Sequence, residues 1–132
     1  MSTFIVDNIK GKTTANTMTV LAGHATDSTT TTNLEQGLTK SWIHLDASSG
    51  TPTAQDSLNV SSLTDTAVGQ HTININNDFN NADYANTVNS NFDGFFWVGT
   101  GYTTEAYQIN VFTGSSYADR TEVIGKSCGD LA

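Results

Sequence analysis

The sequence predicts an all-β protein, an antiparallel β-sandwich knob preceded by an extended N-terminal arm that packs in an oligomer. Of the 132 residues, 47 are Thr, Asn or Ser and 11 are Gly, a composition that disfavours helices and favours strands joined by turns. From residue 40 onward, apolar residues alternate with polar ones at the period of a half-buried strand. Turn residues separate these segments at intervals typical of a sandwich.

Residues 1–39 are predicted to form the arm. Apolar residues are few in this stretch, and tracts rich in Thr and other turn residues separate them. Such tracts favour extended chain and cannot bury a core alone. We therefore expect the arm to anchor the protein or to intertwine with other copies through its two apolar clusters, Phe4, Ile5 and Val6, then Met18, Val20 and Leu21.

Residues 40–132 are predicted to form the knob. The alternation is clearest in 41–45, 70–76 and 106–112, where one strand face carries, in turn, Ile43 and Leu45, then His71, Ile73 and Ile75, then Tyr107, Ile109 and Val111. Shorter strands are expected over 58–63, 95–98 and 121–124. Breaks rich in Gly, Asn, Asp, Ser and Pro are expected over 50–52, 65–69, 76–83, 99–101 and 114–116.

The charge balance excludes two classes of partner. The chain has 5 Lys and Arg residues against 13 Asp and Glu residues, a formal net charge of -8. No basic face can then form to bind nucleic acid or an anionic membrane surface. No apolar run reaches the length of a membrane span, and the first residues lack the regions of a signal peptide. We expect a protein that is made in a cytoplasm.

The sequence predicts no catalytic site, no metal site and no cofactor, because it carries none of the established catalytic or phosphate-binding motifs. His24, His44 and His71 are isolated from one another and are interpreted as strand-face residues with hydrogen-bond partners. The oxygen-rich stretch 78–83 lacks the Gly and Glu of a calcium loop and is interpreted as a turn. Cys128 is alone, so no internal disulfide forms.

Aromatic residues of the knob are the candidate contact residues. Phe95, Phe96 and Trp97 cannot all point inward, because successive side chains of a strand alternate. At least one ring must then face a neighbour, a ligand or the solvent. We expect a contact between subunits, with a sugar-binding platform as the alternative, and the candidate residues are Trp97, Tyr102 and Tyr117, with Tyr107 as a further member of the platform.

Several segments together resemble one module of known proteins. They read K-S-W-I-H-L at 40–45, S-L-N-V-S-S-L-T-D at 57–65, G-Q-H-T-I-N-I at 69–75 and N-A-D-Y-A at 81–85. In order and spacing they resemble the small β domain of marine bacteriophage fibre and appendage proteins, found in cyanophages and pelagiphages. The opening S-T-F-I-V-D-N-I-K-G at 2–11 is also similar to the start of such proteins. His44, Ala67 and His71 depart from the usual Asn, Gly and Tyr without breaking the strand pattern.

The resemblance implies a virion structural protein without catalytic activity, located on the virion surface and forming a homotrimer. The short arm and the lack of an internal repeat favour a capsid decoration, cement or short head-fibre protein over a long fibre. Its partners would be other copies of itself and the major capsid protein or a neck or tail protein. The alternative is a tail-fibre or neck-appendage knob that binds host-surface glycans, and a polysaccharide depolymerase ranks third.

Overall fold

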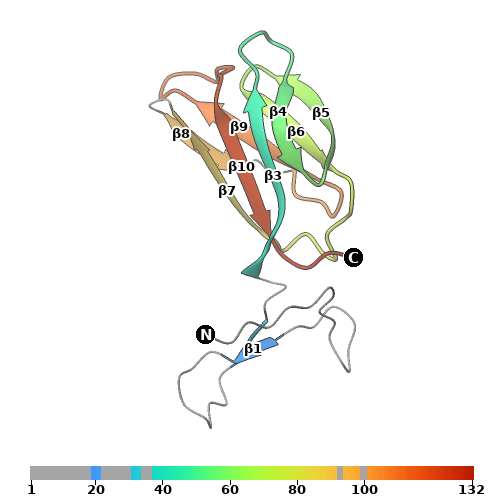
Figure 1. Cartoon of the computed structure of the whole chain (residues 1–132). Coiled ribbons are helices and arrows are strands. Elements are labelled where there is room, and N and C mark those ends of the chain that lie inside the picture. The colour runs from blue at the N-terminus through green and yellow to red at the C-terminus, as the bar shows by residue number, and fades with distance from the viewer. Residues whose placement is uncertain (1–18, 22–30, 34–36, 92–93, 99–100) are drawn as a thin grey trace, which may run out of the picture. The chain divides into compact units, whose positions relative to one another are not determined.

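The computed structural model describes residues 19–21, 31–33, 37–91, 94–98 and 101–132, and its named elements are β-strands (Figure 1). For strands β1, β2 and β8 only the backbone is described. The chain divides into two compact units, Met1–Leu38 and Thr39–Ala132. In the first unit, β1 (Thr19–Leu21) pairs antiparallel with β2 (Thr31–Asn33). The described residues contain no helix that is long and apolar enough to cross a membrane.

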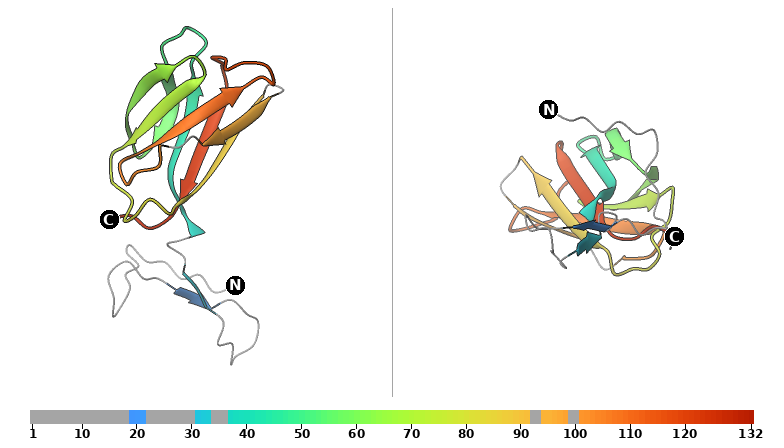
Figure 2. Two further views of the ribbon diagram at one scale, coloured as in Figure 1. Left: turned by 180° about the vertical axis from the view of Figure 1, so that it is seen from behind. Right: turned by 60° about the horizontal axis from the view of Figure 1, so that its bottom comes forward.

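The second unit is built from two four-stranded antiparallel sheets. The first sheet has the order β4-β3-β10-β7 and the second has the order β5-β6-β9-β8. In chain order the strands are β3 (Thr39–Asp46), β4 (Thr53–Leu58), β5 (Val60–Ala67), β6 (Gln70–Ile75), β7 (Ala85–Ser90), β8 (Phe95–Val98), β9 (Ala106–Phe112) and β10 (Val123–Cys128). Figure 2 shows the two sheets facing each other as layers of one sandwich. The predicted all-β sandwich is confirmed for this part of the chain.

The core lies between the sheets and follows the predicted alternation. Buried and less buried positions alternate along β3 and β6, and the apolar residues of these strands point inward. The fully or nearly fully buried apolar side chains come from both sheets and from the 76–84 turn: Ile43, Leu45, Ile73, Ile75, Phe79, Tyr84, Tyr107, Ile109, Val111 and Val123. Burial of such side chains, at about 1.5–3 kcal/mol each, is the main favourable term that holds the two layers together.

Gly125 shows how closely the two layers pack. A Cβ atom at this position would lie 2.8 Å from Ile109 Cδ1, 3.3 Å from Ile43 Cγ2 and 3.5 Å from the Tyr107 hydroxyl. The missing side chain therefore leaves room above all for Ile109, which is completely buried on the opposite sheet. A larger residue here would force the core side chains out of their positions.

Several predicted strand bounds were wrong. The stretch 58–63 is not one strand, because Asn59 adopts φ 57° and separates β4 from β5. A strand was expected over 121–124, but β10 begins at Val123 and extends to Cys128. The break expected over 65–69 is shorter, since β5 continues to Ala67. The strand β7, rich in Asn, Thr and Ser, was missed because it carries one apolar residue in its middle, Val88.

Candidate functional site

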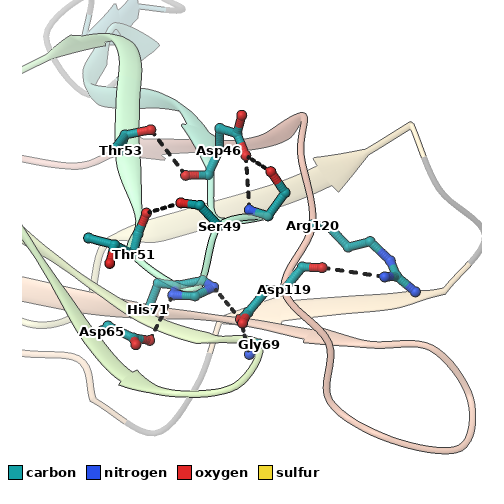
Figure 3. A network of polar contacts seen from close by, with 10 residues as sticks. Asp46, Ser49, Thr51, Thr53, Asp65, Gly69, His71, Asp119 and Arg120 are labelled. Carbon is teal, nitrogen blue, oxygen red and sulfur yellow. Dashed lines mark hydrogen bonds and ion pairs between the residues drawn. The ribbon is translucent and has the colours of Figure 1, made fainter.

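The most unusual polar group of the knob is His71, at the start of the core-facing row of β6. Its side chain is 1% exposed, and it continues the inward row formed by Ile73 and Ile75. A buried histidine in an apolar row needs polar partners, because an unpaired polar group costs free energy when it leaves water. Two carboxylates supply them (Figure 3).

Asp65 and Asp119 approach the imidazole from opposite sides. His71 Nδ1 lies 3.5 Å from Asp65 Oδ1, and His71 Nε2 lies 3.5 Å from Asp119 Oδ1. Asp65 stands directly opposite His71 on the neighbouring strand β5, whereas Asp119 belongs to the segment between β9 and β10. These distances are at the outer limit of a hydrogen bond. The imidazole therefore links β5, the edge strand of the second sheet, to the segment between β9 and β10.

The environment holds the imidazole toward its neutral form. Burial lowers the pKa of His71, and the negative charges of Asp119 and Asp65 oppose that effect only in part. A neutral imidazole carries a single N–H, so it can donate a hydrogen bond to one carboxylate only. The other nitrogen then presents its lone pair to a carboxylate and gains no hydrogen bond from it.

Asp119 also fixes the turn between β5 and β6. The Gly69 N–H donates a 2.6 Å hydrogen bond to Asp119 Oδ1, and Gly69 adopts φ 67°. A Cβ atom on Gly69 would lie 2.5 Å from Ala118 N and 2.7 Å from Val111 O. Only glycine satisfies both the positive φ and this close approach of two backbone segments.

The same segment contacts the first sheet. The backbone N–H of Ala47, at the end of β3, donates a 3.0 Å hydrogen bond to the carbonyl oxygen of Arg120. Arg120 Nη1 in turn lies 3.3 Å from the carbonyl oxygen of Asp119 (Figure 3). Near this end of the knob, Ser48 donates two hydrogen bonds to Asp46, from its backbone N–H and from its hydroxyl, and these bonds lower the pKa of Asp46. The 117–122 segment thus ties both layers together.

This arrangement is suited to holding the fold rather than to processing a substrate. His71 is sealed from solvent, so a substrate atom has no path to either ring nitrogen. Within the described residues, no group of three His, Cys, Asp or Glu side chains is arranged to hold a metal ion. Asp65, Gly69, His71 and Asp119 form what we call the His71 cluster. This cluster therefore holds the β5–β6 hairpin against the 117–122 segment.

A second buried polar group surrounds Tyr107. Burial raises the pKa of Tyr107, and the hydroxyls of Ser41 and Ser127 on the opposite sheet partly offset that effect. Ser127 Oγ also forms a hydrogen bond with Asn86 Oδ1 on β7. Tyr107 is therefore a core residue, and the prediction that it contributes to an aromatic platform was wrong, since a completely buried ring cannot meet a ligand.

The predicted anchoring residues fall in the first unit of the chain. Phe4, Ile5, Val6 and Met18 lie outside the described residues. Val20 and Leu21 lie in β1, where Val20 pairs with Thr32 and Leu21 pairs with Thr31. Anchoring through these residues stays a prediction.

The predicted aromatic contact residues do not form a single group. Tyr102 precedes β9 and its ring centroid lies 5.4 Å from that of Tyr84, while Tyr117 follows β9 and lies 5.5 Å from Phe112. Each of the two tyrosines is 37% exposed. Since β9 spans seven residues, at about 3.3 Å per residue its two ends are roughly 20 Å apart. Trp97 lies in β8 opposite Asn110, and its side chain is not among the described ones.

The other residues considered from the sequence have structural surroundings. In the 76–84 segment, Asn81 Oδ1 accepts a 2.8 Å hydrogen bond from the Asp83 N–H, so the predicted turn is confirmed. His44 lies on the outer side of the first sheet with its Nε2 3.7 Å from Glu122 Oε2. His24 lies outside the described residues, and Cys128 is partly buried with a free thiol.

The His71 cluster was missed by sequence reasoning because its members are distant along the chain. Asp119 is 48 residues from His71, and no local pattern indicates that these side chains meet. The available signal was the position of a histidine in an inward row of isoleucines. Such a residue requires polar partners from other segments.

Comparison with known proteins finds no matching family model, no matching curated protein and no matching solved structure.

Proposed function

We propose that this protein is a structural component of a bacteriophage virion, a homotrimeric capsid decoration, cement or short head-fibre protein without catalytic activity. It is made in the host cytoplasm and resides on the virion surface. Its partners are other copies of itself and the major capsid protein or a neck or tail protein. It uses neither cofactor nor nucleic acid nor membrane.

One observation carries this proposal. The four segments that resemble the phage appendage module fall on β3, on the end of β4 with β5, on β6, and on the turn that leads into β7. They are therefore successive parts of one sandwich. Several of their apolar residues belong to the core, among them Ile43, Ile73 and Tyr84.

Tyr84 illustrates the structural role of these motif residues. Its ring stacks on Phe79 with a centroid distance of 3.9 Å, and its hydroxyl donates to the carbonyl oxygens of Thr103 and Ala106, both at 2.9 Å. Burial raises the pKa of Tyr84 to about 12. The motif thus encodes the packing of a stable knob, which is what a virion component requires.

The experiment combines sedimentation velocity with a shell-binding assay. The purified full chain should sediment as a trimer at micromolar concentration and should co-sediment with capsid shells that lack it. A protein that stays monomeric and binds neither shells nor tails would contradict the proposal.

A glycan-binding knob is the second candidate, favoured by the exposure of the Tyr102 and Tyr117 rings. Exposed aromatic rings can stack on sugars. Glycan-array binding that is lost in Trp97→Ala, Tyr102→Ala or Tyr117→Ala, with unchanged oligomeric mass, would support this candidate over the first.

A further inference from the structure

The outer side of the first sheet carries apolar side chains that are not part of the core. The strand pairing places Leu58, Trp42, Lys126 and Thr87 in one row across β4, β3, β10 and β7. The next row contains Asp56, His44, Ile124 and Asn89. We refer to these eight residues as the Trp42 face.

Three apolar side chains on this face reach solvent. Leu58 is 47% exposed and Ile124 is 48% exposed, and the Trp42 ring between them is partly exposed on a central strand. Single exposed apolar residues are ordinary, but a tryptophan, a leucine and an isoleucine in adjacent rows form a patch. Such a patch is a candidate surface for contact with another molecule.

The charges on and around this face indicate what kind of molecule could bind to it. Lys40 and Lys126 are the only lysines after residue 39, and both belong to strands of this sheet at outward positions. Asp56 and Glu122 lie on the same side. Two acidic copies repel each other over most orientations. They meet favourably where each copy offers both a cation and carboxylates.

We propose that the Trp42 face binds the same face of a second copy of this chain. A two-fold axis that runs parallel to the strands between β3 and β10 places each Lys126 over the Trp42 of the other copy. An ammonium group over an indole ring is attracted to it. The same operation places Ile124 opposite the other copy's His44. It also places the other copy's Asp56 over the strand next to β10, which carries Lys126.

The face is smaller than a standard protein interface. Four strands spaced about 4.8 Å apart and roughly six residues long present on the order of 400 Å² per copy. A stable interface buries about 800 Å² per partner. The contact is therefore expected to be weak between free molecules and to form as the concentration approaches about 1 mM. It becomes important where the copies are held close together, as effective concentrations reach the millimolar range.

The inference does not depend on the virion role. An oligomer held by the arm keeps a constant mass as the protein is diluted, whereas the Trp42 face adds a concentration-dependent step. Sedimentation equilibrium of the full chain from 10 μM to 1 mM separates the two.

Two face variants and one control test the assignment. Ile124→Asp and Leu58→Asp should each weaken the concentration-dependent step at least tenfold. Val68→Asp introduces the same charge at an apolar residue that is 60% exposed in the β5–β6 turn, outside the face. It should leave the step unchanged. Hydrogen exchange of the unmodified chain at 1 mM should slow in β3 and β10 relative to 10 μM, and not in β6.

Three results would overturn the proposal. The first is a mass that is independent of concentration up to 1 mM. The second is an equal loss of association in Val68→Asp and Ile124→Asp. The third is concentration-dependent protection confined to the sheet β5-β6-β9-β8.

Discussion

The inner sides of the two sheets are alike, and their outer sides differ. β3 contributes Ile43 and Leu45 to the core, and β6 contributes Ile73 and Ile75 in the same alternation. On the outer side, the first sheet carries the Trp42 face, with apolar and charged residues mixed. Along β5 and β6, the outer side of the second sheet carries hydroxyl and amide side chains that bond to one another.

The outer side of β5 and β6 shows what a solvated face looks like in this chain. Asn74 Nδ2 donates to Ser62 Oγ at 3.0 Å and lies 3.3 Å from Thr64 Oγ1, and the Thr66 and Thr72 hydroxyls lie 3.1 Å apart. These side chains satisfy their polar groups within the sheet and with water. The abundant Thr and Asn residues therefore suit strand faces that contact water. The Trp42 face differs from them because it carries exposed apolar side chains.

The strongest test of the shared core is truncation on both inner sides. Leu45→Ala in the first sheet and Ile73→Ala in the second should each lower the free energy of unfolding by about 2–5 kcal/mol, because both leave cavities in one core. Urea denaturation followed by fluorescence measures the change. Val68→Ala, at an exposed position, should change stability by less than about 0.5 kcal/mol. If only one of the two truncations lowered the free energy of unfolding by this amount, the two sheets would not share one core.

Gly69→Ala tests the close approach of the β5–β6 turn to the 117–122 segment. Its Cβ would meet two backbone atoms at 2.5 and 2.7 Å in addition to the positive φ, so we expect a loss of about 2–4 kcal/mol. Gly50→Ala is the matched control, since Gly50 has φ 76° and no atom within 4 Å of the added Cβ. It should cost about 1 kcal/mol. Equal losses would show that the turn is not packed as described.

Tyr84→Phe tests the hydroxyl that joins the motif residue to the start of β9. Removing it leaves the carbonyl oxygens of Thr103 and Ala106 without this donor, and we expect a loss of about 1–2 kcal/mol. Tyr102→Phe, at a residue that is 37% exposed, should change the free energy of unfolding by less than about 0.5 kcal/mol. Thermal unfolding of both variants measures the difference. A loss in Tyr102→Phe that matches the loss in Tyr84→Phe would contradict this role.

The His71 cluster gives the smallest expected effect, and a pH dependence. Because the pKa of His71 is lowered in the folded state, the unfolded chain binds a proton more readily. Stability should therefore be full above the unfolded pKa of about 6.5 and should fall as the pH decreases below it, by at most about 1.4 kcal/mol per pH unit. Urea midpoints between pH 7.5 and 5.5 measure this slope.

His71→Gln is the variant that isolates this effect, since glutamine keeps polar atoms in the cluster and does not titrate. Its stability should be nearly independent of pH over the same window, while Asp65 and Asp119 remain in place. A slope that is the same in the variant and in the unmodified chain would assign the pH dependence to other groups.

The fold was largely predictable from the sequence, because burial in this knob follows the period of two. Ile43, Leu45, Ile73, Ile75 and Ile109 occupy the inward positions that their spacing indicated. The bounds failed where one backbone angle decides the outcome. Asn59 at positive φ divides a continuous pattern into two strands, and the pattern of side chains alone does not specify that angle.

The polar cluster and the outer face could not be predicted in the same way. The contacts of His71 with Asp119, and the row that joins Leu58, Trp42 and Lys126, depend on which strands become neighbours. Periodicity assigns a side chain to a face of its own strand. It does not give the order of strands in a sheet.

The central claim is that this sandwich is a virion component. The most direct measurement of this proposal is gold labelling of virions purified from cells that produce the chain, with an antibody raised against residues 39–132. We expect labels at regular positions on the capsid shell, which would assign the protein to decoration or a head fibre. Particles that carry no label on head, neck or tail, with the protein absent from purified virions by mass spectrometry, would contradict the account.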